Sequence, residues 1–383
     1  MPLDVLRIEA RGRGGSISGT GEILANFEDW TSFSLRTSIV EPAELSLELG
    51  DDTGWDRLNE VIQLGSEFQV YLGDRPRLRG RVECLDSAAD AKQGATQRVV
   101  IRTKMSDGVY HSAPQGIRLK GVSLKQFVLT CYAPIGLTED DFDFRGDFSR
   151  DLMTGVSSRG GRPPRALETL RQEQAKVQPT ESIAATVDRH LRRHGFLHWD
   201  GADGKIVVAA PDDQQDPIYF LQLYKESNLA QSNNVKTIQR TFDVGQAPTI
   251  LGIFGAGGKV DFGKTKIGAV VFNPDLIAAG FRRSVVILDE GLKTRDVATH
   301  RANYEFAQRN RGLERVVVGS DGLSYREGAN LIPYAPDTVA DVVSALHGGA
   351  LGAFFVESTQ LSRTVDEGDN STLLMVRQGV WAL

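Results

Sequence analysis

The chain has 383 residues, enough for two to four domains of the usual ~100–200 residues. Hydrophobic residues make up 40% and charged residues 25%, values that predict a folded core. The formal net charge of -6 argues against a general nucleic-acid binder, which carries a basic surplus. No apolar run reaches the ~18–20 residues of a membrane span, and the N-terminal residues do not resemble a signal peptide. The two cysteines, Cys84 and Cys131, form no CxxC pair, which excludes a cysteine zinc site or disulfide scaffold and favours a reducing cytoplasm.

The first hundred residues have the pattern of antiparallel strands. Apolar and polar side chains alternate at residues 33–39 and again at 44–49. Alternation with a period of two is typical of strands that have one apolar and one polar face. Further strands are expected at residues 67–72, 78–85 and 97–104, with turn residues between them. Short strands at this spacing predict a small barrel or sandwich over residues 1-112.

One face of these expected strands is acidic. Residues 41–67 contain eight acids and one base, Arg57. A solvated strand face explains such a run without further function. Strands with acids on one face, closed around an axis, would instead line a pore that repels phosphate backbones. The candidate lumen or ring-contact residues are Glu41, Glu44, Glu48, Asp51 and Asp52.

The rest of the chain mixes helices and strands. Helices are expected at residues 122–132 and 180–194, followed by a hairpin over 196–209, which together predict an α/β middle domain at 113-216. Strands at 217-257 and 313-383 predict a second barrel. An insertion at 258-312, with a long helix over 294–311, is expected to pack with the middle domain. Residues 78–102 and 351–377 share a faint repeat, in which a strand, a polar stretch with Gly and an apolar strand ending in Arg follow one another.

Residues 258–265 match the phosphate-loop pattern GxxxxGK[ST], with Lys264 and Thr265 at its end. A phosphate loop must lead into a helix, whereas residues 266–272 are β-branched and precede Asn273 and Pro274. A Gly-rich loop leading into a strand is therefore favoured. A nucleotide-binding enzyme that uses this loop remains one alternative function, and a polysaccharide-binding or polysaccharide-degrading protein is another.

Histidines recur every four residues at His190, His194 and His198, and the first two would share a helix face. No carboxylate completes a metal site convincingly, and basic residues are favoured in the last turn of a helix. We therefore assign no metal, no cofactor and no catalytic residue to the chain.

The order of these parts resembles a known family. The stretches that carry the resemblance are residues 61–71 with 78–82, 121–125, 180–195, 227–228, 283–287, 298–311, 330–334, 354–356 and 370–374. They resemble, in sequence order, the baseplate hub proteins of contractile phage tails, of the phage Mu type within the late control gene D family. The resemblance covers nearly the whole chain and includes no catalytic motif.

The resemblance implies a non-enzymatic structural protein with an α+β, β-rich fold. Two similar antiparallel β-barrel, tube-like domains with an inserted α/β region would assemble as a homotrimer into a ring of pseudo-six-fold symmetry. Such a hub joins the six-fold tail tube, or a distal tail ring, to the three-fold central spike, and contacts other baseplate (wedge) proteins. DNA would pass through its lumen without specific binding, and no membrane is involved. The chain would fold in the host cytoplasm and reside in the virion tail baseplate.

Overall fold

The computed structural model describes most of the chain. The described residues are 6–11, 23–27, 30–49, 62–90, 94–114, 123–145, 180–225, 233–255, 267–289, 292, 295–328 and 330–381. Two sequence predictions lie outside these residues: the acids Asp51 and Asp52, and the Gly-rich loop at 258–265.

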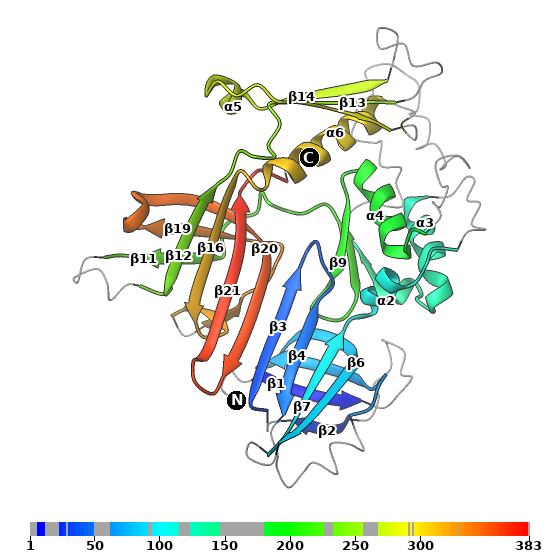
Figure 1. The fold of residues 1–383 in the computed structure, drawn as a ribbon, viewed down its shortest axis with the longest axis vertical. Coiled ribbons are helices and arrows are strands. Elements are labelled where there is room, and N and C mark those ends of the chain that lie inside the picture. The colour runs from blue at the N-terminus through cyan, green and yellow to red at the C-terminus, as the bar shows by residue number, and fades with distance from the viewer. Residues whose placement is uncertain are drawn as a thin grey trace.

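One 13-stranded sheet runs through the molecule (Figure 1). Its N-terminal strands are β1 (Leu6–Arg11), β2 (Ile23–Phe27), β3 (Ser32–Ser38), β4 (Glu44–Leu49), β5 (Glu67–Leu72), β6 (Arg75–Asp90) and β7 (Gly94–Arg102). Its later strands are β11 (Tyr219–Leu223), β12 (Thr237–Phe242), β16 (Glu314–Asp321), β19 (Thr338–Ser344), β20 (Gly349–Thr364) and β21 (Gly368–Arg377). The hydrogen-bonded order is β12-β16-β21-β20-β3-β4-β7-β6-β5-β1-β2, and β19 and then β11 branch from β20.

A helical unit follows β7. It contains α2 (Lys104–Tyr110), α3 (Leu124–Tyr132), the 3-10 turns Ala133–Ile135 and Glu139–Asp141, β8 (Phe142–Phe144), α4 (Ile183–Arg193), β9 (Leu197–Asp200) and β10 (Ile206–Ala209). The hydroxyls of Ser123 and Ser182 accept backbone N–H groups at the starts of α3 and α4, as N-cap residues do. A positive φ of 77° at Gly195 ends α4, a conformation that glycine adopts without steric cost.

A second small unit lies between β12 and β16. Its sheet has the order β14-β13-β15, formed by β13 (Ile250–Phe254), β14 (Gly268–Phe272) and β15 (Ser284–Leu288), with α5 (Pro274–Ala278) after β14. Apolar side chains of β13 pack against Ala298 and Ala302 on α6 (Arg295–Asn310). The remaining elements are the hairpin β17 (Ser324–Glu327) and β18 (Asn330–Pro333), and the 3-10 turn Ala345–His347.

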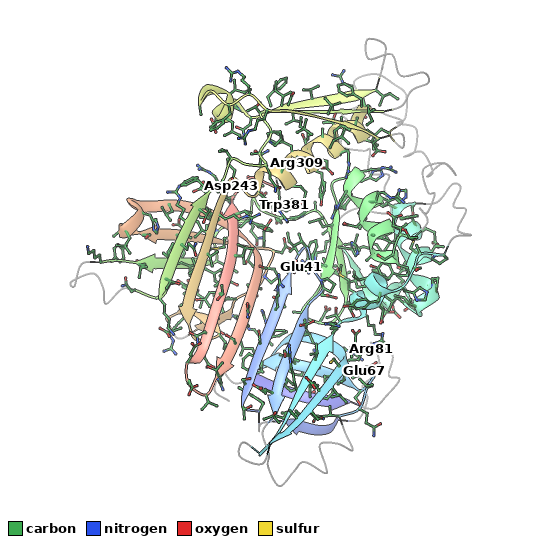
Figure 2. All side chains as sticks on the ribbon, in the orientation of Figure 1. Glu41, Glu67, Arg81, Asp243, Arg309 and Trp381 are labelled. Atoms are coloured by element: carbon green, nitrogen blue, oxygen red, sulfur yellow. The ribbon has the colours of Figure 1, made fainter. Side chains whose placement is uncertain are left out.

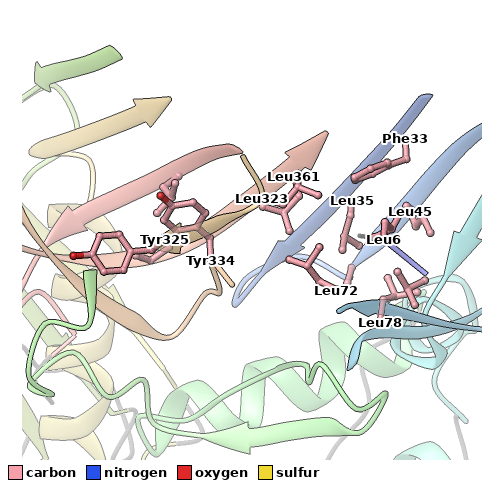
Figure 3. Close-up of a cluster of buried hydrophobic side chains, with 14 of the residues drawn as sticks. Leu6, Phe33, Leu35, Leu45, Leu72, Leu78, Leu323, Tyr325, Tyr334 and Leu361 are labelled. Carbon is pink, nitrogen blue, oxygen red and sulfur yellow. The ribbon is translucent and has the colours of Figure 1, made fainter. Parts of the chain in front are cut away.

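The main hydrophobic core spans both groups of strands. Buried leucines of the N-terminal strands, such as Leu35 and Leu45, belong to one cluster with Leu323, Tyr334 and Leu361 of the C-terminal part (Figure 3). Because they share a core of this size, the two groups of strands form one folded unit rather than two separate domains.

Most elements agree with the sequence pattern, and several do not. The expected strands at 67–72 and 44–49 are β5 and β4, and the long helix expected at 294–311 is α6. The prediction of two barrels is not confirmed: the described strands form one open sheet, because β20 pairs with β3 and joins the two groups edge to edge. Strand β13, placed by the boundary at 257 in the second barrel, pairs instead with β14 and β15. Among the described residues, every helix is too short or too polar to span a membrane.

Candidate functional site

The two groups of strands repeat one topology. In the N-terminal group the order is β3-β4-β7-β6-β5-β1, and in the C-terminal group it is β12-β16-β21-β20-β19-β11. The strands correspond one to one and in the same chain order. The β14-β13-β15 unit with α6 stands where the N-terminal group has only the short connection of residues 39–43. The groups differ at their outer strands, since β1 is antiparallel to β5 whereas β11 is parallel to β19.

The repeat seen in the sequence corresponds to the two long hairpins, β6–β7 and β20–β21. Each begins with a 16-residue strand, and the ladder between the two strands of each hairpin contains one bulge. The bulged residues are Glu83, between Val82 and Cys84, and Glu357, between Val356 and Ser358. A bulge bends a strand and redirects its edge. In both hairpins the long strand therefore leaves its preceding neighbour at a Val-Glu pair: β20 goes on to pair with β3, whereas β6 keeps only β7 among the described residues.

The edge of β20 shows what this change of partner does. Before the bulge β20 pairs with β19, and after it residues 358–363 pair antiparallel with residues 33–38 of β3. The N–H of Ile39 donates to the carbonyl of Glu357 at 3.1 Å. At the centre of this seam the hydroxyls of Thr37 and Thr359 lie 2.8 Å apart and are buried. The seam between the groups is thus a strand ladder continuous with the rest of the sheet.

The predicted acids that the structure describes lie on the polar face of this sheet. Glu44 and Glu48 point from β4 away from the buried leucines, and Glu41 lies just before it, near the end of β3 (Figure 2). Serines and a glutamine of β3 and β20 extend the same face, where Gln360 donates to Ser34 at 3.1 Å. The structure therefore brings Glu41, Glu44 and Glu48 onto one surface.

This surface is not acidic, because arginines of β3 and β7 share it. The Arg102 guanidinium donates to Glu44 at 2.7 Å, and Arg36 pairs with Glu41 at 2.6 Å. The hydrogen bond that Arg102 donates to Glu44 raises the pKa of Arg102 and so keeps the guanidinium charged. Arg98 lies opposite Glu48 in the ladder. The carboxylates are therefore balanced by neighbouring guanidinium groups.

A cavity of about 250 Å³ opens where this face meets the helical unit. It is lined by Arg36, Glu41, Pro42, Ala43, Glu44, Arg102, Ser106, Val109 and Tyr110. Tyr110 is 67% exposed there, and the guanidinium of Arg102 lies 5.8 Å from its ring centre. The cavity thus combines paired charges with an exposed aromatic ring, and aromatic side chains are enriched at protein interfaces.

The histidines do not form a metal site. His190 is buried against the Phe127 ring, and burial together with Arg189 lowers its pKa well below the usual value, so it is neutral. His198 lies on β9 rather than on α4. In the described ranges, no three His, Cys, Asp or Glu side chains are grouped as metal ligands. The Gly-rich loop is followed by strand β14, as the β-branched residues predict, and not by the helix that phosphate binding requires.

The arginines are what the sequence reasoning missed at this site. The acid count stopped at residue 67, whereas Arg98 and Arg102 enter the same face from β7. In the stretch QRVVIR, residues 97–102, alternation puts both arginines on one face of the strand and Val99 and Ile101 on the other face. This alternation was the signal from which the arginines could have been assigned to the polar face. The pairing of β7 with β4, which no local pattern specifies, was needed to use it.

Comparison with known proteins shows which solved structures have a similar fold. No protein family matches the sequence, and no curated protein does. Among solved structures, the tail protein from Neisseria meningitidis MC58 is similar with a TM-score of 0.72 and 13% identity, over 98% of this chain and 97% of that one. The chain has the fold of phage tail proteins.

Two further structures agree. The 43 kDa tail protein of prophage MuSo2 from Shewanella oneidensis has a TM-score of 0.70 and 17% identity, over 98% and 99% of the two chains. The E. coli c3393 protein, described as a type VI secretion component similar to T4 tail proteins gp27 and gp5, has a TM-score of 0.51 and 11% identity, over 96% and 76%. The expected resemblance to tail hub proteins is thereby confirmed at the level of the fold.

Proposed function

We propose that this protein is a structural baseplate hub of a phage-type tail, acting as a homotrimer and without enzymatic activity. In this role it joins the six-fold tail tube, or a distal tail ring, to the three-fold central spike. It also contacts wedge proteins of the baseplate. The tail folds with which it shares its architecture support a place in the virion tail. Folding in the host cytoplasm before assembly is part of the proposal.

The observation that carries the proposal is the repeated topology. Two groups of strands with the same order, β3-β4-β7-β6-β5-β1 and β12-β16-β21-β20-β19-β11, lie edge to edge in one chain. Three copies of such a chain present six equivalent groups around one axis. A three-fold ring with six similar units offers matching contacts to a six-fold tube on one side and a three-fold spike on the other. In this proposal residues 1-112, strands β11 and β12 and the strands of 313-383 make the ring, and residues 113-216 and 250-312 are attached to it.

The polar face of the sheet is the proposed lumen of the ring. A conduit for DNA must avoid holding the phosphate backbone, and phosphate binding is driven by cations that lack protein partners. Arg36 and Arg102 have such partners in Glu41 and Glu44. Glu48, opposite Arg98, belongs to the same lumen, and Asp51 and Asp52 are proposed to extend it. DNA then passes a hydrated surface without a cationic surplus.

The mass of the purified protein in solution tests this proposal first. Light scattering at low and high salt should give three times the chain mass of 41.9 kDa. Negative-stain images of that species should show rings with a central opening. A monomeric mass at all concentrations, or a compact dimer, would overturn the ring.

A charge change tests the lumen separately. Glu44→Lys combined with Glu48→Lys removes the carboxylates next to Arg102 and Arg98 on this face, leaves Arg102 only its ion pair with Glu83, and adds two cations. The ring should then retain duplex DNA in a binding assay at low salt, with the affinity lost as salt rises. Glu367→Lys with Asp366→Lys, at the exposed tip of the β20–β21 hairpin, is the matched control and should not retain DNA. Equal DNA binding by both variants would argue against the lumen assignment.

A further inference from the structure

Several strands of the large sheet have an edge without a described partner strand, and two of these edges lie at opposite ends of the repeated topology. The first is the far half of β6. Strand β5 pairs with β6 only as far as Arg81, and the carbonyl and N–H of Val82 bond to Gly65 and Ser66. Beyond the bulge at Glu83, residues 84–90 pair with β7 alone among the described residues. The second is β12, which pairs with β16 and with no other described strand.

These two edges are the counterparts of the two strands that form the internal seam. Strand β6 corresponds to β20, and β12 corresponds to β3. The correspondence extends to single bonds: Gly65 donates to the carbonyl of Val82 just as Asp337 donates to that of Val356. After this point β20 takes β3 as its partner, whereas β6 has none within the described residues.

We propose that residues 84–89 of β6 pair antiparallel with residues 238–243 of β12 in a second copy of this chain, reproducing between copies the seam that β20 and β3 form within one. This inference rests on the proposed ring and names the surfaces that close it. Each copy offers one edge of each kind, so the contact is head to tail. The sheet then continues from copy to copy, and two edges that would otherwise invite aggregation are paired.

The internal seam fixes the register between copies. The ladder positions Val82, Ile101, Leu45 and Leu35 correspond to Val356, Met375, Val316 and Arg240. Leu35 of β3 therefore corresponds to Arg240 of β12, and Ser38 to Asp243. Since Ser358 faces Ser38, and Cys84 follows its bulge as Ser358 does, Cys84 is expected to face Asp243 of the next copy.

The side chains fit this register. In the next position of this register, Leu85 of β6 would face Phe242 of β12. This pair corresponds to the Thr359–Thr37 pair of the internal seam. Leu85 packs partly against the main core, and Phe242 is 62% exposed. The Arg240 guanidinium lies 4.3 Å from the Phe242 ring centre, covering only one of its faces. Pairing Leu85 with Phe242 buries both and places no like charges opposite each other.

A disulfide cross-link tests the register with a cysteine that the chain already has. Cys84 is exposed and free. The bond from Ile39 to Glu357 makes the adjacent Ser38–Ser358 pair a non-hydrogen-bonded one, whose side chains approach most closely. Cysteines at such a pair can reach disulfide geometry. Asp243→Cys (Figure 2) should therefore give, under mild oxidation, covalent trimers on a non-reducing gel.

Two controls match this variant. Gln239→Cys places a thiol on the same strand and face but opposite Ala88, too far from Cys84 to cross-link. Asp243→Cys combined with Cys84→Ser removes the native partner. Covalent trimers with position 243 and more than tenfold fewer with both controls support the proposed pairing. Cross-linking at position 239 equal to that at position 243 would overturn the register.

The mass in solution separates this inference from the proposed function. A trimer that forms no cross-link at position 243 overturns the β6–β12 pairing and leaves the hub ring standing. A monomer without cross-links at any concentration overturns both. In a second test, Phe242→Asp should reduce the trimer to monomer with an unchanged circular dichroism spectrum. Phe220→Asp on β11, where the native ring is 47% exposed away from this edge, should remain trimeric. A trimeric Phe242→Asp would argue against the pairing.

Discussion

The hydroxyls of Thr37 and Thr359 lie 2.8 Å apart across the seam between the two groups of strands, 322 residues apart in sequence. Both side chains are buried, so each hydroxyl depends on the other for its partner. Removing one, as in Thr359→Val, leaves the other hydroxyl buried without that bond. We expect a loss of about 1–3 kcal/mol in the free energy of unfolding, measured by denaturant titration.

The double variant separates this hydrogen bond from packing. Thr37→Val with Thr359→Val replaces both partners by side chains of the same shape, and two apolar groups at one buried site are close to neutral. We expect the double variant to be more stable than either single one. Losses that simply add in the double variant would show that the two hydroxyls do not interact.

Gly80 explains how β6 serves two partners. A Cβ atom on Gly80 would lie 2.4 Å from the backbone oxygen of Arg102, so the close approach of β6 to β7 requires glycine there. Gly80→Ala forces the strands apart where β6 passes from β5 to β7, and should cost about 2 kcal/mol of unfolding free energy. Gly312→Ala, whose new atom would meet only the guanidinium end of Arg315, is the control and should change stability little. Equal effects of the two substitutions would contradict this account.

Local sequence patterns predicted the strands but not their partners. Alternation at residues 44–49 identified β4, because one face is buried and the other is not. No local signal showed that β20 would pair with β3 rather than close a barrel, since that contact joins residues more than 300 apart in sequence. Strand β19 was also missed, although its residues TVADVVS alternate in burial over most of their length. Helix α2 was not predicted, and its first residue, Lys104, was assigned to the end of the strand expected at 97–104.

In the candidate site, too, local patterns predicted some features, whereas others depend on which strands pair. Glu41 lies outside the strand, in the β3–β4 connection, whereas the position of Glu44 and Glu48 on one face follows from a period of two. The charge of that face does not, because it depends on Arg98 and Arg102 from a strand about 50 residues later. The electrostatic mechanism therefore changes from repulsion by an acidic wall to the absence of unpaired cations.

Asp200 gives the protein a pH-dependent stability. Its carboxylate accepts the N–H of Ala43 at 2.8 Å and the hydroxyl of Thr103 at 2.6 Å, which fastens the helical unit to the β3–β4 connection. Burial raises the pKa of Asp200 from 3.8 to about 6, and these two hydrogen bonds only partly oppose that rise. The folded state therefore holds a proton that the unfolded state has released.

The sign of the effect follows from proton binding. Between pH 4 and pH 6 the folded state binds more protons at Asp200, so unfolding becomes easier as the pH rises through this window. Burial also raises the pKa of Asp337 to about 6, which adds a slope in the same direction. Asp200→Asn should reduce the fall in unfolding free energy between pH 4 and pH 6 without abolishing it. Denaturant titrations at pH 4, 5, 6 and 7 measure this, and an unchanged slope would show that Asp200 does not titrate in that window.

A buried ion pair joins the helical unit to the β14-β13-β15 unit. Arg193, at the end of α4, donates to Asp289 just after β15 through two bonds of 2.9 and 2.7 Å, and each side chain is 12% exposed. Breaking a pair this buried leaves a charge without its partner, at a cost on the order of 3 kcal/mol. Arg193→Met should therefore speed hydrogen exchange at the amides of β13 and β15 and spare β20. Lys125→Met breaks an exposed pair with Glu139 and should leave exchange unchanged, because such pairs contribute about 0–1 kcal/mol. Faster exchange throughout the protein in Arg193→Met would mean that this ion pair stabilises the whole fold rather than one contact between units.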